Sequence, residues 1–234
     1  MLPRVLEAEV MDTEAEAREY DSMDFAEVNR AFVTDFFRAW TGVGLILDVC
    51  TGTARIPIEL CRRYEAITGR ASAEEQQRRG HLLVCGVDLS EHMLELGRRN
   101  VAEARLNSPI YLAKSDAKRL GLLAAHFGAV ICNGSVHHFP DPGACLAEMH
   151  RVCIPGCTIF VRDLLRPVSE GALDDILNAH AAEANDHQRA MFAASLRASL
   201  TLDEVRAAVG RLGYGPEAVQ QTSDRHWTWS AARI

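Results

Sequence analysis

The residues best placed to do chemistry are a glycine and an aspartate that each follow an apolar segment. Gly52 comes just after the apolar run 45–50, and a helical pattern begins directly beyond it. A glycine at such a turn lets a ligand reach backbone amide groups at a helix N-terminus. Asp88 ends a second apolar run, 82–87, where a carboxylate can accept hydrogen bonds from ribose hydroxyls. Together the two residues predict a site for a nucleoside-containing cofactor.

A third acidic residue, Asp48, strengthens this interpretation, since it can orient the loop or accept a hydrogen bond from a ligand ammonium group. Two other interpretations stay open. The loop can be an ordinary strand-to-helix turn, or it can belong to a dinucleotide-binding fold. The dinucleotide signature has three glycines in the loop and an acid about twenty residues further on. Here the loop contains Gly52 alone, and Asp88 comes much later, so that signature fits poorly.

The elements that must position these residues alternate along the chain. Helical patterns separate five apolar runs, at 45–50, 82–87, 110–113, 127–132 and 157–162. Strands that alternate with helices predict a doubly wound α/β fold with a mostly parallel sheet, and burial on both faces explains why each run is continuously apolar. Two further strand patterns, at 218–222 and 227–231, predict a terminal antiparallel hairpin.

Helix starts are marked by capping residues. Ser90, Asp141 and Thr201 are each suited to an N-cap, and Pro142 stands at a first helical position. The chain therefore divides into an N-terminal helical lid over 1–41, a cofactor-binding α/β core over 42–167, a helical insertion over 168–199 above the active site, and the last helix and hairpin over 200–234. The charged stretch 62–80 predicts an extension of a helix and a surface loop.

Composition excludes several classes of function. The formal net charge is -7 with no basic block, which argues against a large nucleic-acid footprint. The sequence has no run of eighteen apolar residues, so no membrane span is expected. Seven scattered cysteines favour buried free thiols and a cytoplasmic location. His150, Cys153 and Cys157 lack a fourth ligand at a recognisable spacing, so no metal site is expected.

Five segments in their order along the chain resemble the motifs of class I S-adenosylmethionine-dependent methyltransferases. They are residues 48–54, 86–94, 114–117, 127–142 and 148–157. The resemblance covers roughly residues 40–165 and implies a seven-stranded, Rossmann-like sheet with S-adenosylmethionine as cofactor. It departs from the family at Cys50 and Ala54, where the loop usually has glycines, at Gly128, where an aspartate is common, and at Cys157, which replaces the second glycine of a Pro-Gly-Gly turn.

The resemblance also implies roles for individual residues. Asp88 would bind the ribose hydroxyls, Asp116 would accept from the adenine amino group, and the amide of Ala117 would meet the ring. An alternative for Asp116 is a helix N-cap. The full set of expected cofactor contacts is Tyr20, Asp48, Cys50, Gly52, Asp88, Leu89, Met93, Asp116, Ala117, Asn133 and Gly134. Tyr20 belongs to a candidate lid, although an amphipathic surface helix is the alternative there.

Catalytic candidates follow the fourth and fifth predicted strands. His137 and His138 have a suitable side chain for a general base, although loop anchoring is the alternative. Asp163 can orient a substrate, or it can pair with Arg162 or Arg166. The predicted function is methyl transfer to a small-molecule acceptor, by a monomer or a homodimer. The alternatives are a protein that binds the same cofactor without methyl transfer, and a nicotinamide-dependent oxidoreductase.

Overall fold

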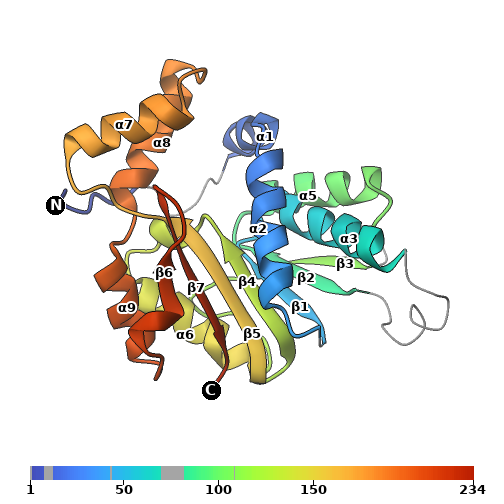
Figure 1. Ribbon diagram of the computed structural model, residues 1–234. Helices are drawn as coiled ribbons and strands as arrows, with labels where there is room; N and C mark the ends of the chain where they lie inside the picture. Colours follow the sequence, from blue (N-terminus) through green and yellow to red (C-terminus); the bar gives the residue numbers. More distant parts are fainter. Residues whose placement is uncertain (1, 8–12, 43, 70–81, 108) are drawn as a thin grey trace.

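The computed structural model describes residues 2–7, 13–42, 44–69, 82–107 and 109–234, and these contain a seven-stranded sheet with helices on both faces (Figure 1). The strands are β1 Ile46–Val49, β2 Val84–Asp88, β3 Ile110–Lys114, β4 Phe127–Asn133, β5 Cys153–Leu164, β6 Val219–Gln221 and β7 His226–Ala232. The helices are α1 Glu14–Ser22, α2 Ala26–Ala39, α3 Arg55–Thr68, α5 Glu91–Glu103, α6 Pro142–Val152, α7 Glu170–His180, α8 Asp186–Ala198 and α9 Leu202–Gly210, with the 3₁₀ turns η1 Val136–His138 and η2 Pro216–Ala218.

The strand order is β3-β2-β1-β4-β5-β7-β6, which confirms the doubly wound fold. Strand β1 pairs in parallel with both β2 and β4, so the chain winds outward to one side and then returns to wind the other. Ligands of open α/β sheets bind at such a reversal, outside the carboxyl ends of the strands. The terminal hairpin is also confirmed, because β7 runs antiparallel to both β5 and β6.

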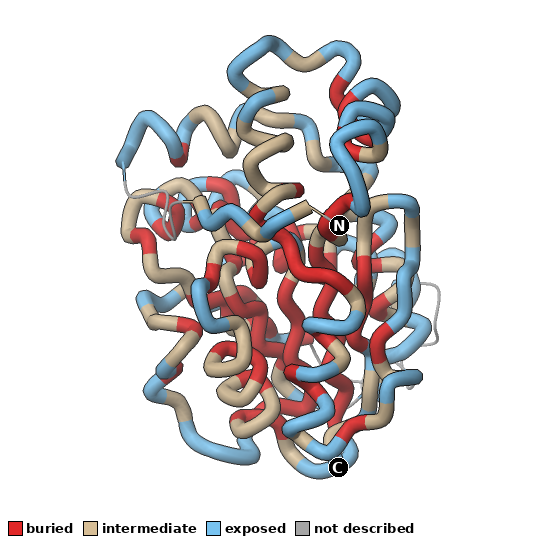
Figure 2. Tube along the Cα trace, turned by 90° about the vertical axis from the view of Figure 1, so that its left-hand side faces the viewer, coloured by how far each residue is buried: buried red, intermediate tan, exposed pale blue. Residues whose placement is uncertain are grey.

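The core lies on both faces of this sheet, as Figure 2 shows by the buried central strands. Neighbouring residues of a strand point to opposite faces. Leu47 of β1 therefore joins the apolar cluster beneath α6 and α9, while Ile46 joins the cluster beneath α2 and α3. In the second cluster, Phe32 and Phe36 of α2 pack edge-on against Phe160 of β5. Burial on both sides is why the strands are continuously apolar in sequence.

The predicted helix starts are confirmed. Ser90 accepts from the Met93 amide, Asp141 accepts from the Gly143 amide, and Thr201 forms a capping box with Glu204. No helix begins at Asp116, so the N-cap alternative for that residue is wrong. Helix α3 ends at Thr68, and most of the charged stretch 62–80 lies outside the described residues.

Two further expectations need correction. Residues 2–7 of the predicted N-terminal lid are not helical, and they run along α8 and η1 instead. Cys153 and Cys157 form a disulfide, so the expectation of free thiols is wrong for this pair. The chain bends between them at Gly156, whose φ is 76°, and this bend leaves their Cα atoms 6.0 Å apart. Cys50, Cys61, Cys85, Cys132 and Cys145 are free. None of the described helices is long and apolar enough to span a membrane.

Candidate active site

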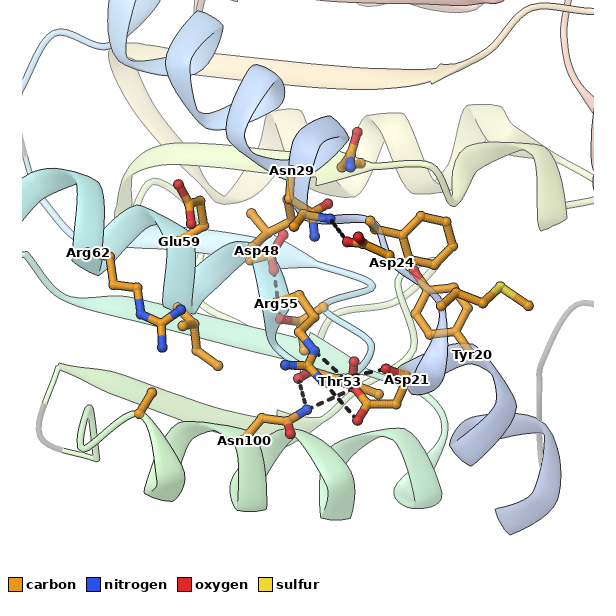
Figure 3. Close-up of a pocket in the computed structure, with 18 of the residues that line it drawn as sticks. Tyr20, Asp21, Asp24, Asn29, Asp48, Thr53, Arg55, Glu59, Arg62 and Asn100 are labelled. Carbon is orange, nitrogen blue, oxygen red and sulfur yellow. Dashed lines mark hydrogen bonds and ion pairs between the residues drawn. The ribbon is translucent and has the colours of Figure 1, made fainter. Parts of the chain in front are cut away.

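Two adjoining cavities open at the carboxyl ends of β1, β2 and β4. The larger, of about 540 Å³, lies between the α1–α2 segment and helices α3 and α5 (Figure 3). The smaller, of about 100 Å³, lies beside the start of α5 and the chain after β4. Tyr20 and Cys50 line both cavities, so the two form one continuous site at the predicted position.

Asp88 joins the loop after β1 to the start of α5. Its Oδ2 atom accepts a hydrogen bond from the Gly52 amide at 2.8 Å, and its Oδ1 atom accepts one from the Ser90 amide at 2.9 Å. Burial raises the pKa of Asp88, although these amides oppose the shift. Each carboxylate oxygen has a second lone pair, and Asp88 lines the smaller cavity, so it can accept further bonds from a ligand.

The loop after β1 has an unusual backbone at three positions. Cys50, Gly52 and Ala54 have φ angles of 60°, 53° and 62°. Glycine adopts these angles without strain, whereas residues with a Cβ adopt them rarely. The structure therefore explains why glycines are usual at the two positions where this chain has Cys50 and Ala54. Those departures keep the loop conformation at some cost in backbone strain.

Asp48 lies at the floor of the larger cavity and is only 2% exposed. The Thr51 hydroxyl donates a hydrogen bond of 2.6 Å to its Oδ2 atom, so Asp48 does orient the loop. Among the described residues no basic side chain forms an ion pair with it. Burial, followed by repulsion from Asp88, raises the pKa of Asp48 to about 7. A cationic group of a ligand would offset this unfavourable buried charge.

Tyr20 of α1 lines the larger cavity, where Figure 3 shows it next to Asp21, and it also lines the smaller one. A Cβ on Gly52 would lie 3.8 Å from its ring. Burial, followed by the charge of Asp88, raises the pKa of Tyr20 to about 12, so the phenol stays protonated and can donate a hydrogen bond. Asp21 next to it forms two 3.0 Å contacts with Arg55 of α3 and accepts from Asn100 of α5 at 2.9 Å.

The remaining predicted cofactor residues also line the site. Leu89, Met93, Asp116, Ala117 and Gly134 line the smaller cavity, and Asn133 lines the larger. The Asp116 carboxylate accepts from the Lys118 amide at 2.9 Å. Partial burial raises the pKa of Asp116, but the bonds and charge of Lys118 outweigh burial and hold that pKa below its usual value.

The histidine pair and Asp163 form a buried polar cluster next to the smaller cavity. Asp163, 1% exposed, contacts His137 Nδ1 at 2.7 Å and accepts from the backbone amides of His137 and Leu164. The alternative that Asp163 pairs with Arg162 or Arg166 is wrong, because those guanidinium groups bind Asp35 and Glu204. His138 lines the smaller cavity, whereas His137 and Asp163 do not.

Sequence reasoning missed Glu7, which completes this cluster. Its Oε1 atom lies 3.2 Å from His137 Nε2 and 3.3 Å from His138 Nδ1. Burial lowers the basicity of His137, but Asp163 and Glu7 outweigh it and raise the pKa of His137 to about 9. No local pattern marks Glu7, since it stands in an acidic stretch far from the histidines in sequence.

Comparison with known proteins identifies the core. Residues 47–161 match the family described as "Methyltransferase domain". Over these residues, just under half of the chain, the α/β core is a methyltransferase domain. This confirms the family that the five sequence motifs predicted, and the matched segment contains the β1 loop, Asp88, Asp116 and the histidine pair.

Curated relatives match about half of the chain. A demethylmenaquinone methyltransferase of Porphyromonas gingivalis is 31% identical over 124 residues, which are 53% of this chain and 45% of that protein. A demethylmenaquinone methyltransferase of Listeria monocytogenes is 34% identical over 122 residues, which are 52% of this chain and 45% of that protein. The chain thus spans less than half the length of these relatives.

Solved structures resemble the whole methyltransferase domain with its added helices. A structure of a putative S-adenosylmethionine-dependent methyltransferase from Methanococcus maripaludis superposes with a TM-score of 0.64 and 15% identity, and it covers 96% of this chain and 95% of its own. A structure of a SAM-dependent methyltransferase from Aquifex aeolicus superposes with a TM-score of 0.63 and 15% identity. It covers 95% of this chain and 99% of its own. At these identities the likeness shows the fold.

Proposed function

We propose that this chain transfers a methyl group from S-adenosylmethionine to a small-molecule acceptor. The observation that carries the proposal is the Asp88 carboxylate, which fixes the β1 loop and the start of α5 while it faces the smaller cavity. That arrangement stands in a methyltransferase domain, at the sheet reversal where ligands bind.

The residues of the site fit the cofactor in charge and in space. A Cβ added to Gly134 would meet no atom within 4 Å, so the backbone is open to a ligand there. The buried Asp48 charge suits the ammonium group of the cofactor, and Asp88 suits its ribose hydroxyls. Asp116 and Ala117 stand beside the same cavity as Asp88, where the adenine would lie.

Chemistry at this site depends mainly on positioning. When bound, S-adenosylmethionine supplies a methyl group on a positively charged sulfur, which a nucleophile displaces. The protein's part is to hold the reactants in line and to exclude water, and Tyr20 is placed to cover the site. His138 can take a proton from an acceptor, since it lines the smaller cavity and its Nδ1 atom lies 3.3 Å from Glu7, whereas His137 and Asp163 do not reach that cavity.

We propose no acceptor class narrower than a small molecule. Helices α1, α2, α7 and α8 lie outside residues 47–161, so the segments that would cover an acceptor are not part of the matched family domain. The match to demethylmenaquinone methyltransferases therefore does not extend to these covering helices. The cytoplasmic location and the oligomeric state stay predictions.

Calorimetry with S-adenosylhomocysteine, the demethylated product, and with NAD tests the proposal. We expect saturable binding of S-adenosylhomocysteine and none of NAD. Asp88→Ala should weaken that binding roughly 10- to 100-fold, because a charged hydrogen-bond acceptor is worth about 1.5–3 kcal/mol. Asp203→Ala, at a carboxylate that is 94% exposed on α9, is the matched control and should bind as wild type. NAD binding without S-adenosylhomocysteine binding would refute the function, and unchanged affinity of Asp88→Ala would refute the site.

A further inference from the structure

We propose that Glu7, His137 and His138 bind a divalent transition-metal ion next to the smaller cavity. This inference does not depend on the proposed methyl transfer. Each residue offers one ligand atom, and the three atoms lie within 4.8 Å of one another. Two histidines and a glutamate form a known zinc-binding combination that leaves one coordination position open.

The spacing of the three side chains suits such an ion. The Glu7 Oε1 atom is 3.2 Å from His137 Nε2 and 3.3 Å from His138 Nδ1. Zinc bonds of about 2.0–2.2 Å in tetrahedral geometry place neighbouring ligand atoms about 3.3–3.6 Å apart. Two of the three distances between ligand atoms are therefore already close to those around a zinc ion, and the third lies within 4.8 Å.

A buried carboxylate orients the first histidine. His137 Nδ1 lies 2.7 Å from Asp163 Oδ1, and the Asp163 carboxylate is itself fixed by the amides of His137 and Leu164. When an ion displaces the Nε2 proton of His137, the remaining ring proton lies on Nδ1 and the Nε2 lone pair faces Glu7. Metal-bound histidines commonly donate their other ring N–H to a carboxylate in this way.

The glutamate is held in place although it comes from a distant part of the chain. Ser195 of α8 donates to its carboxylate at 3.1 Å. Arg4, three residues earlier, donates to the carbonyls of Ala198, His137 and Phe139 at 2.7–3.1 Å. Residues 2–7 are thus anchored on α8 and on the η1 turn, and Glu7 does not have to be recruited from solvent.

Charge favours the ion as well. Glu7 and Asp163 contribute two negative charges to a site that is largely closed to water, since Asp163 and His137 are 1% and 4% exposed. A divalent cation between neutral imidazoles balances both carboxylates. Because His138 also lines the smaller cavity, the ion would stand beside that cavity, and with His138 bound to it the ion, in place of the His138 base, could activate an acceptor oxygen, nitrogen or sulfur.

The test uses the untagged full chain, stripped with a chelator and then desalted. We expect elemental analysis after dialysis against zinc to give about one zinc per chain, and Mg²⁺, which prefers all-oxygen sites, to bind far more weakly. Co²⁺ gives a second readout, because its visible absorption reports the ligand set. Less than about 0.2 zinc per chain would overturn the proposal and leave the cluster as an ion-pair network.

Variants locate the ion. Glu7→Gln, which keeps a hydrogen-bond acceptor for Ser195, and His138→Asn should each lower zinc affinity at least tenfold, and Asp163→Asn should lower it about 10- to 100-fold. His187→Asn is the control, since His187 is 67% exposed and 3.5 Å from Glu19. Circular dichroism confirms folding of each variant. Unchanged zinc affinity in Glu7→Gln would show that any bound ion lies elsewhere and would overturn the site.

Discussion

At the scale of single residues, Asp48 opposes folding and favours ligand binding. Its pKa of about 7 lies above that of an unfolded aspartate, so the folded state holds the proton more tightly and stability falls as pH rises from about 4 to 7. Asp48→Asn, which still accepts from Thr51, should be more stable at pH 8 by about 2 kcal/mol, or roughly 4–8 °C in Tm. It should also bind S-adenosylhomocysteine about tenfold more weakly.

Thermal unfolding of the ligand-free proteins at pH 5 and pH 8 checks this. The gain in Tm should be clearly larger at pH 8, where the wild-type carboxylate is charged. A gain of the same size at both pH values would show that its origin is not the Asp48 charge. The wild-type stabilisation by ligand should in turn decline below pH 7, since protonated Asp48 loses its attraction for an ammonium group.

Single residues were predictable where their neighbours in sequence fix them. Gly52 and Asp88 could be assigned because each follows a strand whose end is visible as the end of an apolar run. Glu7 could not, because its contacts with His137 and His138 join segments far apart in the chain. The partner of Asp163 was missed for the same reason, since Arg162, Arg166 and His137 compete for it and only packing decides among them.

At the scale of elements, α1 is held over the cofactor cavity by Asp21. Arg55 and Asn100 bind its carboxylate (Figure 3), and Tyr20 beside it lines both cavities. Asp21→Ala should release α1, so that bound S-adenosylhomocysteine dissociates about tenfold faster while its association rate changes little. Stopped-flow measurements of dissociation, together with hydrogen exchange over Glu14–Ser22, would show both effects.

Glu14→Ala is the matched comparison on the same helix. Glu14 pairs with Arg18, but both side chains are more than 60% exposed, and such pairs contribute little. Its dissociation rate should equal that of the wild type. If Asp21→Ala also matched the wild type in both dissociation and exchange, α1 would not act as a lid, and the amphipathic surface helix would be the better interpretation.

Element boundaries show the same division between local and distant causes. Ser90, Asp141 and Thr201 mark helix starts because a capping side chain binds an amide two or three residues away. The early start of β5 at Cys153 follows instead from pairing with Phe127 of β4 across a register shift. Nothing near Cys153 in sequence specifies that pairing.

At the scale of the whole molecule, the alternation of apolar runs and helical patterns was enough to predict the sheet. It could do so because a parallel sheet buried on both faces leaves a continuous signal in every strand. The insertion leaves no comparable signal. Its helices α7 and α8 were predictable as helices, but their packing against η1 and residues 2–7 depends on Arg4 and Ser195, which local patterns do not mark.

The size of each core predicts how the molecule unfolds. Helices α7 and α8 stand away from the sheet (Figure 1) around a small cluster of four buried side chains: Leu173, Ile176, Leu177 and Leu196. Segments with few buried apolar contacts open at lower free energy than the global transition. Native-state hydrogen exchange should therefore report a lower opening free energy for Glu170–His180 and Asp186–Ala198 than for the strands β1 and β4.

Leu177→Ala separates this local opening from global unfolding. Removing the buried side chain should lower the opening free energy of α7 and α8 by about 2–3 kcal/mol and leave exchange in β4 unchanged. Asp175→Ala, at an exposed position of the same helix, should change neither. Equal losses of protection in α7, α8 and β4 would mean that the insertion and the sheet unfold as one unit. With independent opening, the insertion can expose the cavity edge near His138 without melting the sheet that holds Asp88.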